Sequence, residues 1–315
     1  MTKKTKTILV TGGTGFIGSH LCKELLDQGN TVICADNLVS GSLNNIDLFS
    51  KNKNFIYQNV DISDELDISV KVDEVYNLAC PASPVDYKYL PIETLMACSL
   101  GVKNVLDVAV KNKAKFLHTS TSEVYGDPLE HPQRETYFGN VNPVGERSCY
   151  DEGKRFAESL IVSYGQKYGL DYKIVRIFNT YGPNMRENDG RVVSNFINQA
   201  IREDALTIYG KGNQTRSFCY VKDTVGGLIK MMQSAENGPI NIGNPDEKTI
   251  IDLAKIVLDI SGSKSIIVSK PFFTKDDPAK RKPDITLART RLKWNPKISL
   301  ELGLRKTYDY FKERY

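Results

Sequence analysis

Short runs of apolar, mostly β-branched residues alternate in the first half of the chain with longer stretches whose apolar residues recur every three or four positions. This pattern predicts buried parallel strands separated by helices. The expected strands are residues 7–11, 31–35, 55–58, 75–79, 114–119 and 172–177, and the expected helices are residues 15–28, 91–111 and 150–168. Such alternation is typical of an α/β fold with a doubly wound parallel sheet of the Rossmann type.

After residue 177, proline and glycine interrupt the pattern more often, for example at Gly182-Pro183 and Gly238-Pro239. Helices are still expected over residues 192–202, 221–233, 249–261 and 300–313. We therefore predict a Rossmann domain over residues 1–177 and a smaller mixed α/β lobe over residues 178–315. We expect the chain to return to the first domain near residues 217–242.

The composition excludes several classes of protein but does not change the predicted fold. The 315 residues are 40% hydrophobic and 25% charged, as in ordinary globular proteins, and the net charge of +4 is too small to argue for nucleic-acid binding. The chain has no apolar run long enough to span a membrane and begins without a secretory signal, so we expect a cytoplasmic protein. Its six cysteines lack C-x-x-C or zinc spacing, which favours buried thiols and no metal site.

A glycine-rich turn joins the first expected strand to the first expected helix. Its sequence, Thr11-Gly12-Gly13-Thr14-Gly15-Phe16-Ile17-Gly18, has G-x-x-G-x-x-G spacing. Gly12 suits the tight turn, Gly15 permits close approach of a pyrophosphate, and Gly18 permits close helix–sheet packing. The helix N-terminus, at Phe16 and Ile17, would offer N–H groups to the phosphates. This strand–turn–helix context predicts a dinucleotide site.

Asp36 ends the second expected strand, about 20 residues after the glycines, where an acid accepts both ribose hydroxyls of a dinucleotide. A carboxylate there favours NAD over NADP, and the alternative is a solvated acid at a strand end. The other residues expected on the cofactor side are Asn37, Asp61, Ile62 and Leu78.

Tyr150 and Lys154 lie one helical turn apart, on one face of the helix expected over residues 150–168. Lys154 and a nearby positive nicotinamide would lower the pKa of the Tyr150 phenol, which could then take a proton from a sugar hydroxyl. Y-x-x-x-K is common by chance, and Tyr164 or Tyr168 could form similar pairs. The sequence around Tyr150 and Lys154 makes a catalytic role more specific than the motif alone does. About 27 residues upstream, an expected strand leads into Ser120-Thr121-Ser122-Glu123.

Together these residues resemble the extended short-chain dehydrogenase/reductase family that acts on nucleotide sugars, over essentially the whole chain. Within it, the segments are most similar to the UDP-glucuronate decarboxylases. The matching segments are residues 81–84 (PASP), 120–128 (STSEVYGDP), 149–155 (CYDEGKR), 176–183 (RIFNTYGP), 189–196 (DGRVVSNF) and 276–284 (DDPAKRKPD).

The resemblance implies a redox-neutral decarboxylation of UDP-glucuronate to UDP-xylose with bound NAD. C4 is oxidised while Tyr150 takes the hydroxyl proton, C6 leaves as carbon dioxide, and C4 is reduced again. Tyr150 and Thr121 would stabilise the enolate, and Glu123 would position the acid or water that protonates C5. Lys154 would orient the nicotinamide ribose. For Glu123 the alternative is a surface acid in a salt bridge.

Two other functions on the same scaffold remain alternatives, those of a nucleotide-sugar 4-epimerase and of a 4,6-dehydratase. Ser122 argues against the dehydratase, because that subclass carries an aspartate there to protonate the departing C6 hydroxyl. An epimerase needs only the Tyr150 redox step and room for the keto sugar to turn over. A third possibility, an idle NAD-sensing protein, is disfavoured by the intact catalytic residues.

The resemblance also implies the residues that hold the UDP-sugar. Cations and amides suit a diphosphate and a sugar, and the matched positions are Asn104, Asn179, Arg191, Tyr209, Gln214, Arg216 and Arg281. For each arginine the alternative is a solvated charge or a structural ion pair.

One departure concerns Met96-Ala97-Cys98, where relatives carry Lys-Thr and often Asn, with the lysine near the sugar or cofactor in the family. Relatives form homodimers through a four-helix bundle, which here would use residues 91–111 and 150–168. The partners implied are thus a UDP-sugar and a second copy of the chain, with neither nucleic acid nor membrane.

Overall fold

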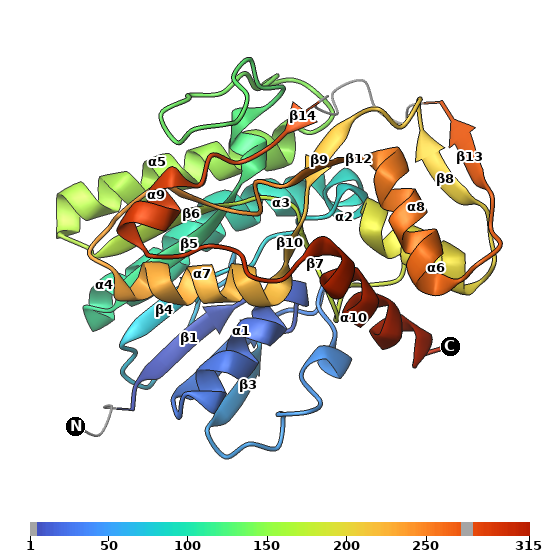
Figure 1. The fold of residues 1–315 in the computed structure, drawn as a ribbon. Coiled ribbons are helices and arrows are strands. Elements are labelled where there is room, and N and C mark those ends of the chain that lie inside the picture. Colours follow the sequence, from blue (N-terminus) through green and yellow to red (C-terminus); the bar gives the residue numbers. More distant parts are fainter. Residues whose placement is uncertain (1–4, 272–279) are drawn as a thin grey trace.

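The computed structural model describes residues 5–271 and 280–315, so the first four residues of the 276–284 motif lie outside the described residues. A seven-stranded sheet, parallel throughout, forms the centre of the molecule (Figure 1). In spatial order its strands are β3 (Phe55–Asn59), β2 (Thr31–Asp36), β1 (Thr7–Thr11), β4 (Glu74–Asn77), β5 (Lys115–Thr121), β6 (Tyr172–Ile177) and β11 (Ile240–Ile242). This order confirms the predicted Rossmann-type doubly wound sheet.

Helices cover both faces of the sheet, and the alternation of side chains along each strand explains why. Ile8 and Val10 of β1 join a core with α1 (Phe16–Asp27) and α7 (Val221–Gln233). Leu9, pointing the other way, joins a second core with α4 (Val102–Asn112) and α5 (Ser148–Tyr168). Strands buried on both faces need continuous apolar runs, which is the pattern that the sequence shows.

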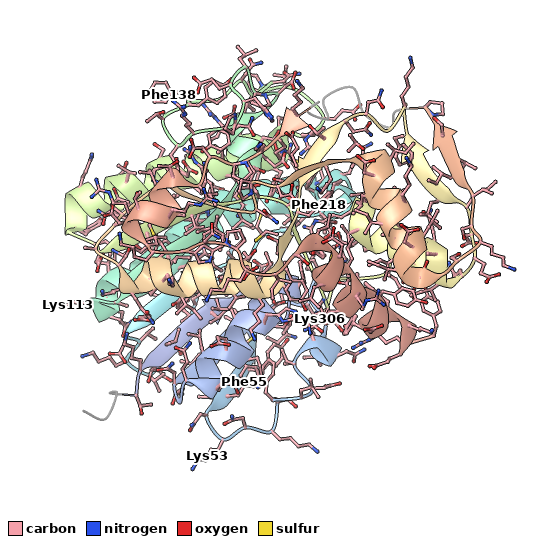
Figure 2. The ribbon with its side chains drawn as sticks, viewed as in Figure 1. Lys53, Phe55, Lys113, Phe138, Phe218 and Lys306 are labelled. Carbon is pink, nitrogen blue, oxygen red and sulfur yellow. The ribbon has the colours of Figure 1, made fainter. Side chains whose placement is uncertain are left out.

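The second half forms a lobe in which α6 (Val192–Ile201), α8 (Ile250–Ser261) and α10 (Leu300–Lys312) pack together (Figure 1). Its shorter elements, mostly not predicted, are β7 (Thr180–Tyr181), β8 (Leu206–Tyr209), β9 (Thr215–Ser217), β10 (Cys219–Tyr220), β12 (Glu247–Thr249), β13 (Ile267–Lys270), β14 (Lys280–Arg281) and α9 (Thr286–Arg291). Figure 2 shows Phe218, only 4% exposed, in the middle of the molecule, whereas Phe138 lies at the periphery and is 88% exposed.

The chain crosses from the lobe back to the sheet, since α7 packs on α1, β5 and β6, and β11 pairs with β6. These elements fall in the region where a return is expected. The boundary at residue 177 itself stays a prediction.

The helix expected over residues 91–111 is not one regular α-helix. It consists of α3 (Pro91–Met96), a π-helical segment η2 (Ala97–Gly101) and α4. Hydrophobic spacing cannot distinguish this arrangement from a continuous helix, because one wider turn barely disturbs the apolar stripe. A short helix α2 (Pro84–Tyr89), capped by the Ser83 side chain, precedes it and was not predicted. Two 3-10 turns, η1 (Leu43–Asn45) and η3 (Ser122–Tyr125), complete the elements.

None of the helices in the described part of the chain combines the length and apolar character that a membrane span requires.

Candidate active site

A cavity of about 660 Å³ lies where the carboxyl ends of the central strands face the lobe. The order of the strands reverses direction on either side of β1, and such a switch point is the usual ligand site of an open α/β sheet. All but one of the predicted site residues line the cavity: Gly12, Gly15, Phe16, Ile17, Gly18, Asp36, Asn37, Asp61, Ile62, Leu78, Thr121, Glu123, Tyr150, Lys154, Asn179, Arg191, Tyr209, Gln214, Arg216 and Arg281.

Asn104 is the exception, because the structure does not place it at the cavity where a substrate contact was expected. Its amide donates hydrogen bonds to the carbonyls of Ile62 and Asp64, at 3.0 and 2.9 Å, and it is not among the described residues that line the cavity. Asn104 instead ties α4 to the loop after β3. Sequence similarity alone could not separate a residue that touches a ligand from one that supports the loop behind it.

The glycine turn has the close packing that a dinucleotide site needs. Gly12 has a φ of +71°, and a Cβ there would lie 2.8 Å from the Ala79 nitrogen. A Cβ on Gly18 would collide with the Gly12 carbonyl oxygen and lie 2.8 Å from the Gly13 Cα. Gly15 caps α1 without a side-chain hydrogen bond, so the N–H groups of the first turn stay available at the cavity wall.

Asp36 is buried and held by the backbone. Its Oδ2 accepts a hydrogen bond from the Thr14 N–H at 3.0 Å, and its Oδ1 accepts one from the Leu38 N–H at 2.8 Å. Beside it, the Asn37 amide donates to Asp61 Oδ2 at 2.7 Å. Each carboxylate oxygen can accept a further hydrogen bond, so Asp36 can still receive ribose hydroxyls from the cavity. The turn and this acid together fit NAD.

Replacement of Gly18 by alanine tests this part of the site. The added methyl group must displace the backbone of the turn, because the atoms that it meets belong to Gly12 and Gly13. We expect at least tenfold weaker NAD binding, measured by fluorescence titration of the nucleotide-free protein. Gly226→Ala is the control, since Gly226 has no positive φ and a Cβ there meets nothing within 4 Å. Unchanged NAD affinity in Gly18→Ala would contradict the assignment of the turn.

Tyr150 lies on the first turn of α5, and its ring stacks on that of Tyr87 from α2, with centroids 5.2 Å apart. Lys154, one turn later, donates to the Thr119 carbonyl at 2.9 Å and lies 5.8 Å from the centre of the Tyr150 ring. Burial raises the pKa of Tyr150, the nearby Cys80 adds to this, and a hydrogen bond with Thr121 acts in the opposite direction. Burial therefore decides the direction of the shift, and Lys154, which we expected to lower this pKa, is not among its main causes.

Glu123 is the centre of a buried ion-pair network, and so it is not the surface acid that we considered. Arg281 binds both of its carboxylate oxygens, at 2.5 and 2.7 Å, and Arg147 binds one of them. Burial disfavours the charged form, but Arg147, Arg281 and Arg216 outweigh it and hold the pKa of Glu123 below its ordinary value. Thr121 places this residue, because its Oγ1 accepts the Glu123 N–H at the start of η3.

The pairing of two short strands brings the arginines together. Arg281 of β14 lies opposite Arg216 of β9 in a parallel ladder, and both side chains are buried. Lys280, the neighbour of Arg281, is exposed, because successive side chains of a strand point to opposite faces. The run Lys280-Arg281-Lys282 therefore sends one guanidinium into the cavity wall.

The remaining lobe residues form the opposite wall. Arg191, at the start of α6, donates to the Ala82 carbonyl at 3.1 Å and pairs with Asp189 at 3.3 Å. Gln214 donates to the Tyr209 carbonyl at 2.9 Å, and Tyr209 is 41% exposed at the end of β8. Asn179 lies between β6 and β7 and lines the cavity as well.

Sequence reasoning missed Arg147 and Tyr87, both of which line the cavity. The Arg147 guanidinium lies 5.7 Å from the centre of the Tyr87 ring while it binds Glu123. Arg147 immediately precedes α5, three residues before Tyr150. No motif marked it, because its role depends on the approach of η3.

Asp151, next to Tyr150, is buried, and its Oδ1 has no hydrogen-bond partner among the described residues. Burial and the nearby Glu123 carboxylate raise the pKa of Asp151 to about 7, and Arg147 offsets this only in part. A carboxyl with a raised pKa keeps its proton to higher pH in the folded than in the unfolded chain. Its contribution to stability therefore falls as pH rises from about 4, the unfolded value, to about 7.

We expect Asp151→Asn to remove that fall, so that the variant gains about 3 kcal/mol of unfolding free energy relative to the parent between pH 4.5 and pH 7.5. Urea denaturation at several pH values measures it. Glu152→Gln is the matched control, because Glu152 lies on the same helix but is half-exposed and pairs with Arg155 at 3.5 Å. Equal pH slopes in Asp151→Asn and the parent would contradict the raised pKa.

Comparisons with known proteins agree with this geometry. Residues 9–307 match the GDP-mannose 4,6 dehydratase family. The chain is 51% identical to UDP-glucuronic acid decarboxylase 1 of Arabidopsis thaliana over 312 residues, which cover 99% of this chain and 71% of that protein.

Two solved structures share the fold over nearly their whole length. UDP-glucose 4-epimerase of Thermotoga maritima, solved with UDP-glucose, is 32% identical, with a TM-score of 0.90 over 98% of this chain and 99% of that one. UDP-glucuronic acid 4-epimerase of Bacillus cereus, solved with UDP-glucuronic acid and NAD, is 29% identical, with a TM-score of 0.85 over 98% and 100%. The chain therefore belongs to the extended short-chain dehydrogenases/reductases of the GDP-mannose 4,6 dehydratase family.

Proposed function

We propose that this protein is an NAD-dependent UDP-glucuronate decarboxylase, which forms UDP-xylose and carbon dioxide. The observation that carries the proposal is the convergence of Tyr150, Thr121 and Glu123 on one cavity whose lobe wall carries buried arginines. The similarity to plant decarboxylases over nearly the whole chain supports the same reaction.

The turn at Gly12–Gly15–Gly18 and Asp36 would hold NAD, and Lys154 would orient its nicotinamide ribose. When bound, NAD supplies the oxidant for C4 of the sugar and the reductant for the ketone that results. Tyr150 accepts the C4 hydroxyl proton and later returns it, so the site needs no external acid for this pair of steps.

Decarboxylation follows from the position of the ketone. The C6 carboxylate is β to the C4 ketone, so the electron pair of the breaking C5–C6 bond moves onto the C4 oxygen. Tyr150 and Thr121 stabilise that enolate with hydrogen bonds, and Glu123 positions the acid or water that protonates C5. Ser122 offers no carboxyl group to expel a C6 hydroxyl, which a dehydratase requires.

The buried arginines suit the anionic substrate. Arg191, Arg216 and Arg281, with Asn179, Tyr209 and Gln214, would bind the UDP and the sugar. Arg216 and Arg281 lie side by side near Glu123, and both line the cavity, where guanidinium groups can bind an anionic ligand.

Incubation with UDP-glucuronate, with carbon dioxide and sugar nucleotides both measured, tests the proposal. Equal amounts of carbon dioxide and UDP-xylose are expected. UDP-galacturonate without gas would overturn it in favour of a 4-epimerase, the activity of the Bacillus cereus neighbour.

We also propose a cytoplasmic homodimer formed through α3–α4 and α5. The six cysteines are free thiols, as a reducing compartment favours. Leu100 and Phe156, on these helices, are 39% and 52% exposed. Sedimentation velocity should show a dimer that Leu100→Glu or Phe156→Glu converts to monomers. Leu48→Glu should leave the dimer intact, because Leu48 is 95% exposed on the loop between β2 and β3, and its neighbours Ile46 and Phe49 join the core on the other face of the sheet.

A further inference from the structure

Two cysteines that are 18 residues apart in the chain meet at the wall of the active site. The sulfur atoms of Cys80 and Cys98 lie 3.4 Å apart, within hydrogen-bond distance. Cys80 belongs to the segment between β4 and α2, which lines the cavity, and Cys98 belongs to the π-helical segment η2. Sequence reasoning predicted only buried thiols here, because the two residues have neither C-x-x-C nor zinc-site spacing.

Both thiols pack close to α5, the helix that carries Tyr150 and Lys154. Cys80 packs in one apolar cluster with Tyr150, Tyr87 and Cys149. Cys98 packs against Gly153, since a Cβ on Gly153 would lie 3.1 Å from the Cys98 Cβ and 3.3 Å from its sulfur. The thiol pair therefore joins the cavity wall, η2 and α5 at one point.

The surroundings favour a reactive thiolate in this pair. A hydrogen bond from Cys80 lowers the pKa of Cys98 to about 7 against the effect of burial, and the positive charge of Lys154 acts in the same direction. Cys80 is half-buried and lines the cavity, so a small solute can reach the pair from there. A thiolate next to a second thiol is the arrangement that senses oxidants in other proteins.

We propose that Cys80 and Cys98 form a peroxide-sensitive dithiol, whose oxidation to a disulfide slows this enzyme reversibly. One sulfur attacks the O–O bond of hydrogen peroxide, which gives a sulfenic acid and one water. The other sulfur then displaces the sulfenic oxygen, which forms the S–S bond and releases a second water. The two thiols lose two hydrogens and two electrons, and one peroxide becomes two waters.

The bridge must distort the site, because an S–S bond is about 2.05 Å long and the sulfurs would have to move roughly 1.3 Å closer. That movement changes the packing of Cys80 against the cluster of Tyr87, Cys149 and Tyr150. Catalysis is sensitive to displacements of about 1 Å, with losses of the order of 10²-fold. We expect kcat to fall at least tenfold.

The test uses reduced, NAD-loaded protein treated with a small excess of hydrogen peroxide. Free thiols are then blocked, and peptides are mapped by mass spectrometry without reduction. The expected result is a linked peptide pair containing Cys80 and Cys98, at least tenfold slower carbon dioxide release, and recovery of the rate with dithiothreitol. The measured rate depends on the proposed decarboxylation, whereas the peptide map does not. A mapped bridge in a protein that is inactive on UDP-glucuronate would therefore contradict only the proposed decarboxylase function.

Serine variants distinguish the effect of oxidising this pair from that of oxidising Cys149, the third thiol near the site. The rate of each variant after peroxide is compared with the rate of the same variant before treatment. Cys98→Ser and, as a second variant, Cys80→Ser should keep their rates within twofold after peroxide. Cys149→Ser should lose its rate as the parent does, because Cys149 donates to the Tyr87 carbonyl at 3.5 Å and not to the pair. Inactivation of Cys98→Ser to the parent's extent, or a complete bridge without loss of rate, would overturn the proposal.

Discussion

Replacement of Tyr150 by phenylalanine is expected to lower kcat by about 10³-fold or more while NAD stays bound. The variant keeps the ring that stacks on Tyr87, so the packing of the cavity wall is preserved. It removes the hydroxyl that must exchange a proton with the C4 oxygen. Carbon dioxide release measures the rate, and nucleotide extracted from the denatured protein measures the bound NAD.

Tyr164→Phe is the matched control for this change. Tyr164 lies on the same helix, and its hydroxyl donates to Asp107 at 2.8 Å, but it is not among the described residues that line the cavity. Its kcat should stay within about twofold of the parent, since general acid–base catalysis requires direct reach of the substrate. A Tyr150→Phe enzyme that retains a tenth of the parent rate would remove Tyr150 from the proton transfer.

The second large effect is expected for Glu123→Gln, on both stability and rate. Glutamine leaves Arg147 and Arg281 without the carboxylate that they bind, and a buried charge without its partner costs about 3 kcal/mol or more. Because we propose that Glu123 positions the acid or water that protonates C5, we expect kcat to fall about 10²-fold as well. Urea denaturation and carbon dioxide release measure the two effects.

The pH dependence of the stability loss gives an independent check. The pKa of Glu123 is lowered in the folded protein, so its contribution to stability is present above the unfolded pKa of about 4.3 and is lost as pH falls through the folded value. The difference in unfolding free energy between the parent and Glu123→Gln should therefore shrink below about pH 4.

Glu158→Gln separates chemistry from stability. Glu158 is equally buried, binds Arg176 at 2.7 Å and accepts a hydrogen bond from Ser120 at 2.6 Å, but it lies off the cavity. We expect a similar loss of stability with kcat within about threefold of the parent. Equal losses of kcat in both variants would show that Glu123 acts through folding alone.

Local features explain why much of the fold was predictable. The strand expected over residues 172–177 and the helix expected over residues 221–233 match β6 and α7, since burial on a fixed face imposes a period that the sequence displays. The glycine turn and the Tyr150–Lys154 pair are local as well, because four residues of helix bring two side chains to one face. The dinucleotide turn and the catalytic pair could therefore be located along the chain.

Contacts between residues that are far apart in the sequence could not be predicted from such local patterns. Arg281 is 158 residues from the Glu123 carboxylate that it binds, and the two-residue strand that places it was not predicted. Asn104 resembled a ligand contact but supports a loop, and Cys80 meets Cys98 through a π-helical turn that hydrophobic spacing does not reveal.

The sequence by itself thus determined the parallel sheet, the dinucleotide turn and the placement of Tyr150 and Lys154 on one face of a helix. Periodicity and close spacing express short-range geometry, which each segment carries within itself. Only the tertiary structure decided which arginines surround Glu123, that burial raises the pKa of Tyr150, and which thiols face each other. These properties depend on strand register, on the approach of the lobe to the sheet, and on the exclusion of water between them, none of which a local pattern specifies.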